Sequence, residues 1–379
     1  MKIVIDSTSL LQPSAGVRNY LHYWLDSLLT LKAGDERIST YPVRLAIPSQ
    51  LDHERSVSGK LGTIIGINLT RFLNIRSNPA IDFFFLGANL FHASQHVTNL
   101  PRLPKITATI FDLSCWRTPQ YHTAANVAAT RRYGENILKM ADGLIAISES
   151  ARDDAVDVLR IPEDRIRVIY PGVAEPFFHV TEPERHRSRA KYGIDRPYLL
   201  FVGCVEPRKN VRAIIQAYRL LSAPLRRDVQ LIIAGPFGWE SEELRTMLVA
   251  DEQHVRYLGY VPEGDLPGLV AGAVALAYPS FYEGFGLPAV QAMAAGVPVI
   301  GSDRSCLPEV IGDGGILVNP DSVEELSVAF RRICTSLELA EELGFRGRTR
   351  AQRFRWSTCA TESLEFFRDV GSRAKSGGW

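Results

Sequence analysis

The chain has 379 residues, more than the ~250–300 at which a single hydrophobic core usually stops growing, so we expect two domains. Hydrophobic residues make up 46% of the chain and charged residues 22%, which is typical of a globular protein. Because 43 Lys and Arg nearly balance 42 Asp and Glu, the net charge of +1 excludes a chain-wide attraction to nucleic acid.

The cysteines and the apolar segments indicate a cytoplasmic protein. The five cysteines lie far apart and form no Cys-x-x-Cys pair, which argues against a zinc or redox motif and is typical of a reducing compartment. The first residues, MKIVIDSTSLLQPSAG, contain no long apolar stretch and do not resemble a signal peptide. No apolar run reaches the ~18 residues that a membrane-spanning helix needs.

Short apolar runs predict a series of strands, each followed by a turn and a helical pattern. Many of these runs are continuously apolar, which is typical of strands buried on both faces of a parallel sheet. The alternation of strand and helix predicts the α/β class, with two Rossmann-like, doubly wound domains. The predicted strands are 2–7, 44–48, 90–94, 106–112, 143–148 and 166–170 in the first half, and 198–203, 229–235, 255–260, 274–278, 298–301 and 315–318 in the second.

The domain boundary is expected between residues 170 and 196. This stretch, YPGVAEPFFHVTEPERHRSRAKYGIDR, holds three prolines and a cluster of charges, and a new strand begins directly after it. We therefore place the first domain at 1–175 and the second at 176–355.

Two adjacent cations follow the first strand of the second domain, in the sequence FVGCVEPRKN (201–210). Pro207 suits the first turn of a helix, so Arg208 and Lys209 are expected beside the carboxyl end of a parallel strand, where open α/β sheets bind ligands. A planar Arg fork next to a Lys ammonium could clamp a diphosphate. The alternative is a solvated basic first turn, although cations at a helix N-terminus oppose the helix dipole.

A glycine-rich loop follows a later strand, in the sequence YPSFYEGFGLPAVQ (278–291). Its two glycines allow the backbone to approach a ligand closely, and Pro288 marks the first turn of the next helix. The backbone N–H groups at that helix start suit an anion, and the polar side chains of the segment could face a sugar and a ribose. The candidate residues of this loop are Glu283, Gly284, Phe285, Gly286, Leu287 and Gln291.

This ordered loop resembles the Glu-x7-Glu motif of the retaining glycosyltransferases of family 4, which have the GT-B fold. The resemblance covers nearly the whole chain, through FVGCVEPRKN, VRYLGYVPEGDLPGLVAGA and LPEVIGDGGILVNPDSVEELSVAF. It implies a cleft between the two Rossmann-like domains and a C-terminal helix, 356–379, that crosses back onto the first domain. It further implies retention at the anomeric carbon and no metal or other cofactor, and the chain contains no Asp-x-Asp sequence.

The resemblance also assigns roles in donor binding. It implies that Arg208 and Lys209 contact the donor diphosphate and that Glu283 holds hydroxyls of the donor sugar. The second glutamate of the motif is Gln291 here, and an amide can still hydrogen-bond ribose hydroxyls. Tyr260 and Val261 match the segment whose backbone contacts the base. The phosphate-binding residues and Glu283 are also the expected catalytic residues.

In the first half, the resemblance points to four further positions. Gly16 matches a glycine-rich loop that closes on the donor phosphates, with a plain βα turn as the alternative. His92 matches a position on the acceptor side, with a structural histidine as the alternative. Phe111 and Asp112 stand where many relatives have His-Asp, whose histidine touches the donor sugar near C6.

The substitution at Phe111 suggests a particular donor sugar. Phe111 cannot donate a hydrogen bond, and burying an unpaired hydroxyl costs ~1–3 kcal/mol. An apolar ring beside C6 therefore favours the methyl group of a 6-deoxyhexose. The alternatives are a neutral substitution and a Phe111 ring that is turned into the core.

The EPRKN form of the phosphate segment resembles mannosyl- and deoxyhexosyltransferases of bacterial surface polysaccharide assembly, including O-antigen. We therefore expect GDP-mannose or a GDP-6-deoxyhexose of the rhamnose or fucose type as donor, and a glycan or lipid-linked glycan as acceptor. The alternatives are a UDP-glucose-type glucosyltransferase, a GT-B sugar-nucleotide epimerase or phosphorylase, and a catalytically silent nucleotide-sugar-binding partner.

The segment 60–76 could contact a membrane. It mixes apolar side chains with three cations, as amphipathic helices at the inner membrane face do. The alternative is a helix that packs on the sheet. The apolar residues are Leu61, Ile64, Ile65, Leu69, Phe72 and Leu73, and the cations are Lys60, Arg71 and Arg76.

Overall fold

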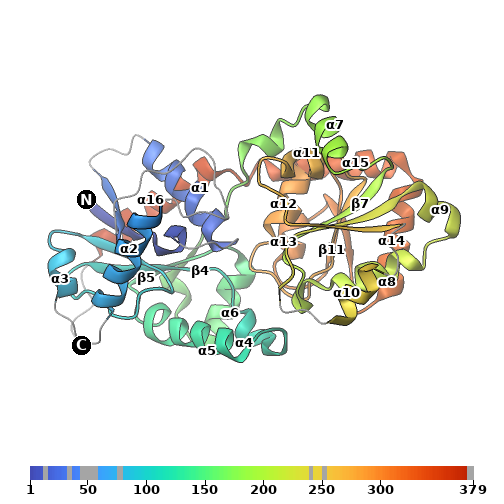
Figure 1. The fold of residues 1–379 in the computed structure, drawn as a ribbon. Helices are drawn as coiled ribbons and strands as arrows, with labels where there is room; N and C mark the ends of the chain where they lie inside the picture. The colour runs from blue at the N-terminus through green and yellow to red at the C-terminus, as the bar shows by residue number, and fades with distance from the viewer. Residues whose placement is uncertain are drawn as a thin grey trace. The chain divides into compact units, whose positions relative to one another are not determined.

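The structure is a computed structural model that describes residues 1–11, 16–31, 36–42, 59–74, 80–238, 242–249 and 254–373. It consists of two compact units (Figure 1), each with its own parallel sheet. The first unit is Met1–Gly172 with Trp356–Trp379, and the second is Val173–Arg355. The last helix, drawn in red in Figure 1, therefore belongs to the unit that contains the N-terminus.

The described residues of the first unit form a sheet in the order β2-β1-β3-β4-β5-β6 with parallel pairing throughout. Its inner strands are buried on both faces, which the apolar run of β5 predicts and which β4 shows although its sequence, KITATI, includes two threonines. The predicted strand 44–48 lies outside the described residues, and β2 has the sequence RISTY, whose polar residues hid it from the apolar pattern. The strands are β1 Lys2–Asp6, β2 Arg37–Tyr41, β3 Leu90–Ala93, β4 Lys105–Ile110, β5 Gly143–Ala146 and β6 Ile166–Val168.

Helices cover both faces of this sheet. On one face α1 packs against α16, where Trp24 Nε1 donates a hydrogen bond of 2.9 Å to Ser363 Oγ. On the other face Leu73, Phe85 and Leu159 join the core with alternate strand residues. The helical elements are η1 Thr8–Leu11, α1 Val17–Thr30, α2 Gly59–Leu73, α3 Ala80–Phe84, α4 Ser114–Arg117, η2 Pro119–Tyr121, α5 Ala124–Tyr133, η3 Gly134–Leu138, α6 Glu149–Leu159, η4 Glu163–Arg165 and α16 Trp356–Ser372.

The second unit has a parallel sheet in the order β12-β11-β10-β7-β8-β9. Read from β9, this is the doubly wound order 3-2-1-4-5-6. Successive strands are added toward one edge of the sheet up to β9 and toward the other edge from β10, so the strand order reverses between β7 and β10. That reversal places the loops after β7 and β10 next to each other at the carboxyl edge. The strands are β7 Tyr198–Val202, β8 Gln230–Ala234, β9 Val255–Gly259, β10 Ala275–Tyr278, β11 Val299–Ser302 and β12 Gly315–Val318, as the apolar runs predict within a few residues.

A glycine directly follows each of the neighbouring strands β7 and β8. Gly235 has a φ of 138°, and a Cβ atom there would lie 1.9 Å from the carbonyl oxygen of Gly203. The glycine thus allows two neighbouring strand ends to approach closely beside the loop of Arg208 and Lys209. The helical elements of this unit are η5 Glu175–Phe178, α7 Glu182–Lys191, η6 Pro207–Lys209, α8 Val211–Arg219, α9 Ala223–Asp228, α10 Glu242–Val249, α11 Leu266–Ala271, α12 Leu287–Ala294, α13 Leu307–Ile311, α14 Val323–Thr335 and α15 Leu337–Ala351.

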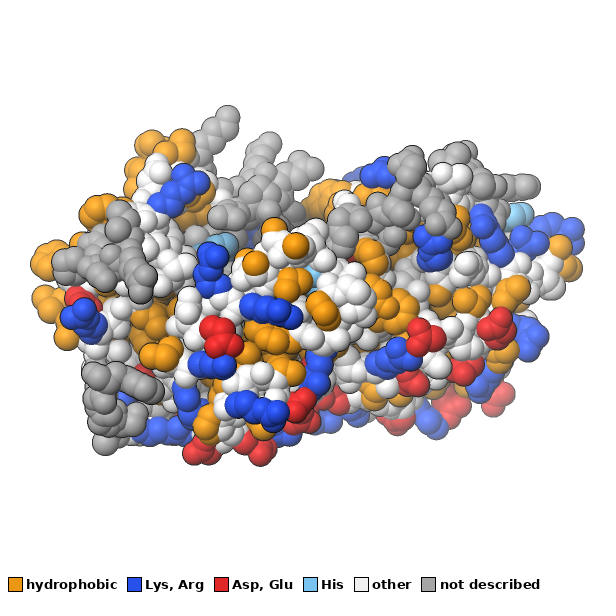
Figure 2. Space-filling model, turned by 90° about the horizontal axis from the view of Figure 1, so that it is seen from below, with side chains coloured by type: hydrophobic (Ala, Val, Ile, Leu, Met, Phe, Trp, Pro, Cys, Tyr) orange, Lys and Arg blue, Asp and Glu red, His pale blue; other side chains and the backbone are white. Residues whose placement is uncertain are grey.

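The surface in Figure 2 carries Lys and Arg side chains interspersed with Asp and Glu, in keeping with the net charge of +1. Within the described ranges, no helix is both long enough and apolar enough to span a bilayer.

Candidate active site

The predicted cation pair lies at the strand-order reversal of the second sheet. Pro207–Lys209 forms a 3-10 turn, and the α-helix begins only at Val211, so the expectation of a helix starting near Pro207 is wrong by one turn. The reason is Asn210, whose left-handed backbone (φ 58°) separates the turn from α8. Its side-chain amide donates to the carbonyl oxygens of Pro279 (3.3 Å) and Pro320 (2.7 Å), which fixes the cation turn to neighbouring loops.

The Glu283 loop follows β10 and leads into α12, which begins at Leu287 as predicted. Gly286 provides the left-handed conformation (φ 82°) that the chain adopts before this helix. Ser305, from the loop after β11, fixes Glu283 by accepting from its N–H (2.9 Å) and donating to its carbonyl oxygen. The carboxylate is therefore held by a rigid backbone and not by a free loop.

Arg208, Lys209 and Glu283 share one environment. Lys209 Nζ lies 2.5 Å from Glu283 Oε1, and Arg208 Nη1 lies 3.2 Å from Glu283 Oε2. Arg208 Nη2 also pairs with Glu206 Oε1 at 2.6 Å, and Lys209 Nζ donates to the Tyr278 hydroxyl at 2.7 Å. Two cations and two carboxylates thus form one buried cluster at the carboxyl edge of the sheet, which we call the Glu283 cluster.

The electrostatics of the cluster hold Glu283 as an anion. Burial raises the pKa of its carboxyl group, but the charges and hydrogen bonds of Lys209 and Arg208 outweigh burial and lower that pKa to about 2. The ionised carboxylate can only accept hydrogen bonds, so it can bind groups that donate them, such as hydroxyls. The cation ends of Arg208 and Lys209 point at Glu283, so any anion that binds them would compete with this carboxylate.

The remaining donor-side candidates surround this cluster or follow β9. Gly284, Phe285 and Gly286 are buried, and the Phe285 ring packs edge-on against Phe354 at 5.4 Å. Leu287 and Gln291 are half-buried on α12. After β9, Tyr260 is 40% exposed whereas Val261 is buried.

Three of the four first-half candidates also occupy loops that follow strands. Gly16 precedes α1 with a φ of 41° and has open space where a Cβ would be; residues 12–15 of its loop lie outside the described part of the chain. Asp112 Oδ1 accepts from the N–H (3.0 Å) and hydroxyl (2.6 Å) of Ser114 at the start of α4. The half-buried Phe111 ring lies edge-on against Tyr20, with centroids 5.1 Å apart.

His92 belongs to the core of the first unit. Its Nδ1 and Nε2 each lie 3.0 Å from a threonine hydroxyl of β4, those of Thr107 and Thr109, and the side chain is buried among Trp24 and Phe367. Burial lowers the pKa of the imidazole to about 3, so it is neutral. These contacts favour the structural alternative for His92.

Sequence reasoning missed the residues that hold the cluster in place. Glu206 stands beside the cations in EPRKN, and its charge next to Arg208 was the available signal. Tyr278, Asn210 and Ser305 carry no signal in their spacing, because they come from the ends of different strands that only the sheet order brings together.

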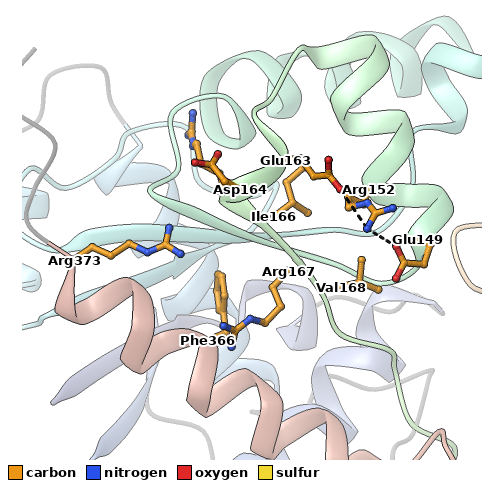
Figure 3. Close-up of a pocket in the computed structure, with 10 residues that line it drawn as sticks. Glu149, Arg152, Glu163, Asp164, Ile166, Arg167, Val168, Phe366 and Arg373 are labelled. Carbon is orange, nitrogen blue, oxygen red and sulfur yellow. Dashed lines mark ion pairs between the residues drawn. The ribbon is translucent and has the colours of Figure 1, made fainter.

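A pocket of about 740 Å³ lies along the edge strand β6 in the first unit, away from every predicted site residue. Figure 3 shows Arg373 at one end and Glu149 with Arg152 at the other. Two of its cations have partners, since Arg152 pairs with Glu149 (2.6 Å) and Arg167 pairs with Asp369. None of the residues predicted for the donor site lines this pocket.

Known proteins show which family has this architecture. Residues 184–350 match the model of the glycosyl transferases group 1, and residues 92–175 match that of Glycosyltransferase Family 4. The O-antigen chain mannosyltransferase B of Escherichia coli is 33% identical over 291 residues, which cover 76% of this chain and 74% of that protein.

Solved structures show the same fold at lower identity. Sucrose-phosphate synthase from Thermosynechococcus elongatus superposes with a TM-score of 0.72 at 20% identity, covering 98% of this chain and 99% of that one. Anabaena Alr3699/HepE in complex with UDP-glucose superposes with a TM-score of 0.71 at 18% identity, covering 97% and 100%. This chain therefore belongs to glycosyltransferase family 4, has the GT-B fold and is a glycosyltransferase.

Proposed function

We propose that this glycosyltransferase transfers a mannose-type hexose or 6-deoxyhexose, with retention and without a metal ion, from a GDP-linked donor to a glycan or lipid-linked glycan. The observation that carries the proposal is the Glu283 cluster, in which two cations and a fixed carboxylate meet at the strand-order reversal of the second unit. The relative from Escherichia coli, named as an O-antigen chain mannosyltransferase, supports the sugar and the acceptor class.

The cluster supports a mechanism in which Arg208 and Lys209 exchange their ion-pair partner when the donor binds. The donor diphosphate attracts Arg208 and Lys209 away from Glu283, whose carboxylate then accepts hydrogen bonds from sugar hydroxyls. As the bond between the anomeric carbon and the diphosphate breaks, its electron pair goes to the diphosphate, which the two cations and the N–H groups at the start of α12 stabilise. The acceptor oxygen bonds to the anomeric carbon on the same face and passes its proton to the departing phosphate.

A thermal-shift screen against GDP-mannose, GDP-fucose, UDP-glucose and a dTDP-sugar tests the donor, because a ligand that binds the native state raises the melting temperature. We expect the largest rise with a GDP-sugar, and Lys209→Ala should abolish it. Lys191→Ala, which removes an exposed ion pair with Asp265 in the same unit, is the matched control and should keep the rise. A larger rise with UDP-glucose would establish the glucosyltransferase alternative, which the UDP-glucose complex of Alr3699/HepE suggests.

Turnover assays distinguish a glycosyltransferase from an epimerase and from a catalytically silent binding protein. Removing one electrostatic donor to a developing anion lowers kcat by about 10²–10³-fold, and we expect that loss for Lys209→Ala in a sugar-transfer assay. Conversion of the donor without an acceptor would instead indicate an epimerase. Donor binding without any turnover would indicate a silent binding partner.

The half-buried Phe111 ring supports the 6-deoxyhexose hypothesis because it remains partly accessible, whereas its contact with the buried Tyr20 is also what a ring turned into the core would make. We expect the wild type to favour GDP-fucose or GDP-rhamnose over GDP-mannose in kcat/KM, and Phe111→His to reduce that preference. Equal preference in both proteins would show that the substitution is neutral.

Membrane contact through α2 is a further part of the proposal. Four apolar side chains are more than half exposed on one side of this helix, whereas Leu73 is buried and Thr70 and Gly66 face inward. The helix thus packs on its unit and still presents an apolar stripe near Arg71, which suits an anionic bilayer. The exposed residues are Leu61, Ile64, Ile65 and Phe72.

Liposome flotation tests this contact. Ile65→Asp should reduce flotation with anionic vesicles, whereas Leu337→Asp, at an exposed leucine of α15 in the other unit, should not. Equal flotation of both variants and the wild type would remove the membrane contact from the proposal.

A further inference from the structure

The first unit has its own strand-order reversal, and a polar cluster lies there. In the order β2-β1-β3-β4-β5-β6, β1 pairs with β2 on one side and with β3 on the other. Open α/β sheets of this order bind ligands outside the carboxyl ends of the strands that flank the reversal. Here those ends carry Asp6, the last residue of β1, and Ser94 and His96, directly after β3.

Asp6 is a buried and fully oriented carboxylate. It is 1% exposed. Its Oδ1 accepts from the N–H (3.0 Å) and hydroxyl (2.6 Å) of Thr8, and its Oδ2 accepts from the Ser94 hydroxyl. The same Ser94 oxygen accepts from the N–H of His96 at 3.2 Å. One serine hydroxyl therefore links the buried carboxylate to the backbone of the histidine.

His96 is fixed at its backbone and open at its ring. Its carbonyl oxygen accepts from Asn74 Nδ2 at 2.7 Å, and its N–H is held by Ser94. The half-buried imidazole lies within electrostatic reach of Asp6, and in the described part of the chain no hydrogen bond fills its ring nitrogens. His92 is the opposite case, since its ring is buried and both nitrogens are occupied by threonines. Of these two histidines, His96 is the one whose ring offers hydrogen bonds to a ligand.

We propose that the His96 imidazole binds a hydroxyl of the acceptor saccharide, and that Asp6 acts through Ser94 as its positioning residue. This inference rests on the proposed glycan acceptor and names the group of the first unit that recognises it. A neutral imidazole is suited to a sugar hydroxyl, because the ring can both donate and accept hydrogen bonds. The acceptor would thus bind at the reversal of one sheet, as the donor is proposed to bind at the reversal of the other.

The protonation states agree with this role. Burial lowers the pKa of His96, although Asp6 opposes the shift, so a neutral ring with a free lone pair is favoured at neutral pH. Burial raises the pKa of Asp6, and the hydrogen bonds from Ser94 and Thr8 oppose this shift, as does the charge of His96 when its ring is protonated. The other titratable groups that sense Asp6 are Tyr41 on β2 and Tyr133 on α5; burial raises their pKa values, so both are neutral.

Direct binding tests the inference without turnover. The full-length protein is titrated with α-mannotriose, chosen because the Escherichia coli relative is an O-antigen chain mannosyltransferase, while the histidine ring signals are followed by NMR. We expect the His96 signal, assigned by its loss in His96→Gln, to shift, and those of His92 and His186 to stay. An unmoved His96 signal overturns the inference. Because no donor is present, this result is independent of whether the proposed donor is correct.

Kinetics give the second test. His96→Gln should raise the acceptor KM about tenfold, the effect of losing a hydrogen bond, and leave the donor KM unchanged. His186→Gln, at an exposed histidine of α7, is the matched control and should change neither. A wild type that turns over no GDP-sugar refutes the proposed function, whereas an active wild type with an unchanged acceptor KM in His96→Gln refutes this inference.

The positioning role of Asp6 has its own readout. The Asp6 carboxylate stabilises the protonated ring, so Asp6→Asn should lower the pKa of His96 in an NMR titration and raise the acceptor KM. If the pKa of His96 does not change in a folded Asp6→Asn protein, Asp6 does not act on this ring.

Discussion

Removing a single charge from the Glu283 cluster should lower the free energy of unfolding. Lys209 and Glu283 are buried and the Arg208 side chain is 12% exposed, so Glu283→Ala leaves two neighbouring cations in a site of low solvent access. Breaking a buried ion pair on one side typically costs about 3–5 kcal/mol, and we expect a loss of that order in urea unfolding. Asp321→Ala breaks the exposed pair with Arg304 and should cost less than about 1 kcal/mol. Equal losses in the two variants would contradict the burial argument.

The same carboxylate makes stability depend on pH. The pKa of Glu283 is lowered from 4.5 to about 2 on folding, so the folded state binds its proton less readily than the unfolded state. The contribution of Glu283 to the free energy of unfolding is therefore fully present above pH 4.5 and is lost as the pH falls from 4.5 to about 2. Melting temperatures measured across this window should fall more steeply for the wild type than for Glu283→Gln, which has no proton to bind. Parallel curves would show that Glu283 is not held as an anion.

At the scale of elements, the close approach of β7 and β8 depends on one glycine. Gly235→Ala would place a Cβ atom 1.9 Å from the Gly203 carbonyl oxygen at a φ of 138°. Backbone strain and overpacking each cost about 1–3 kcal/mol, so we expect a loss of more than about 3 kcal/mol in chemical denaturation. Gly264→Ala, with no atom within 4 Å of its Cβ, should stay within about 0.5 kcal/mol of the wild type.

The helix α16 completes the core of the first unit at the scale of the whole molecule. It returns to this unit from the far end of the chain and buries Phe366, Phe367 and Val370 there, while Ser363 accepts the hydrogen bond of Trp24. Deletion of 356–379 should therefore make residues 1–172 sensitive to protease and leave 173–355 resistant, since the second unit has its own sheet and core. Mass spectrometry of the fragments from limited proteolysis identifies which unit is cleaved. As a control, deletion of 374–379 alone should leave both units resistant. Equal sensitivity of both units after the larger deletion would show that they do not fold independently.

Local patterns in the chain were enough to predict much of the fold. Continuously apolar runs predicted the inner strands β5 and β10, because a strand that is buried on both faces needs apolar side chains at successive positions. Gly286 and Pro288 predicted the start of α12, because a proline is suited to the first turn of a helix and a glycine to the unusual backbone before it. The polar strand β2 and the inserted turn at Asn210 were missed, since neither differs in composition from a loop.

The sequence by itself determined the α/β class and the family, and it supplied the residue types of the proposed donor site, because short stretches of neighbouring residues carry each of these signals. Only the tertiary structure decided which side chains are partners. Glu283 meets Lys209 across 74 positions of the chain, and the Asp6 carboxylate meets Ser94 across 88. It also decided that His92 is a core residue and that His96 has the open ring. The physical reason is that strand order sets which loop ends are neighbours, and burial at those ends then sets the charge and hydrogen bonding of each group.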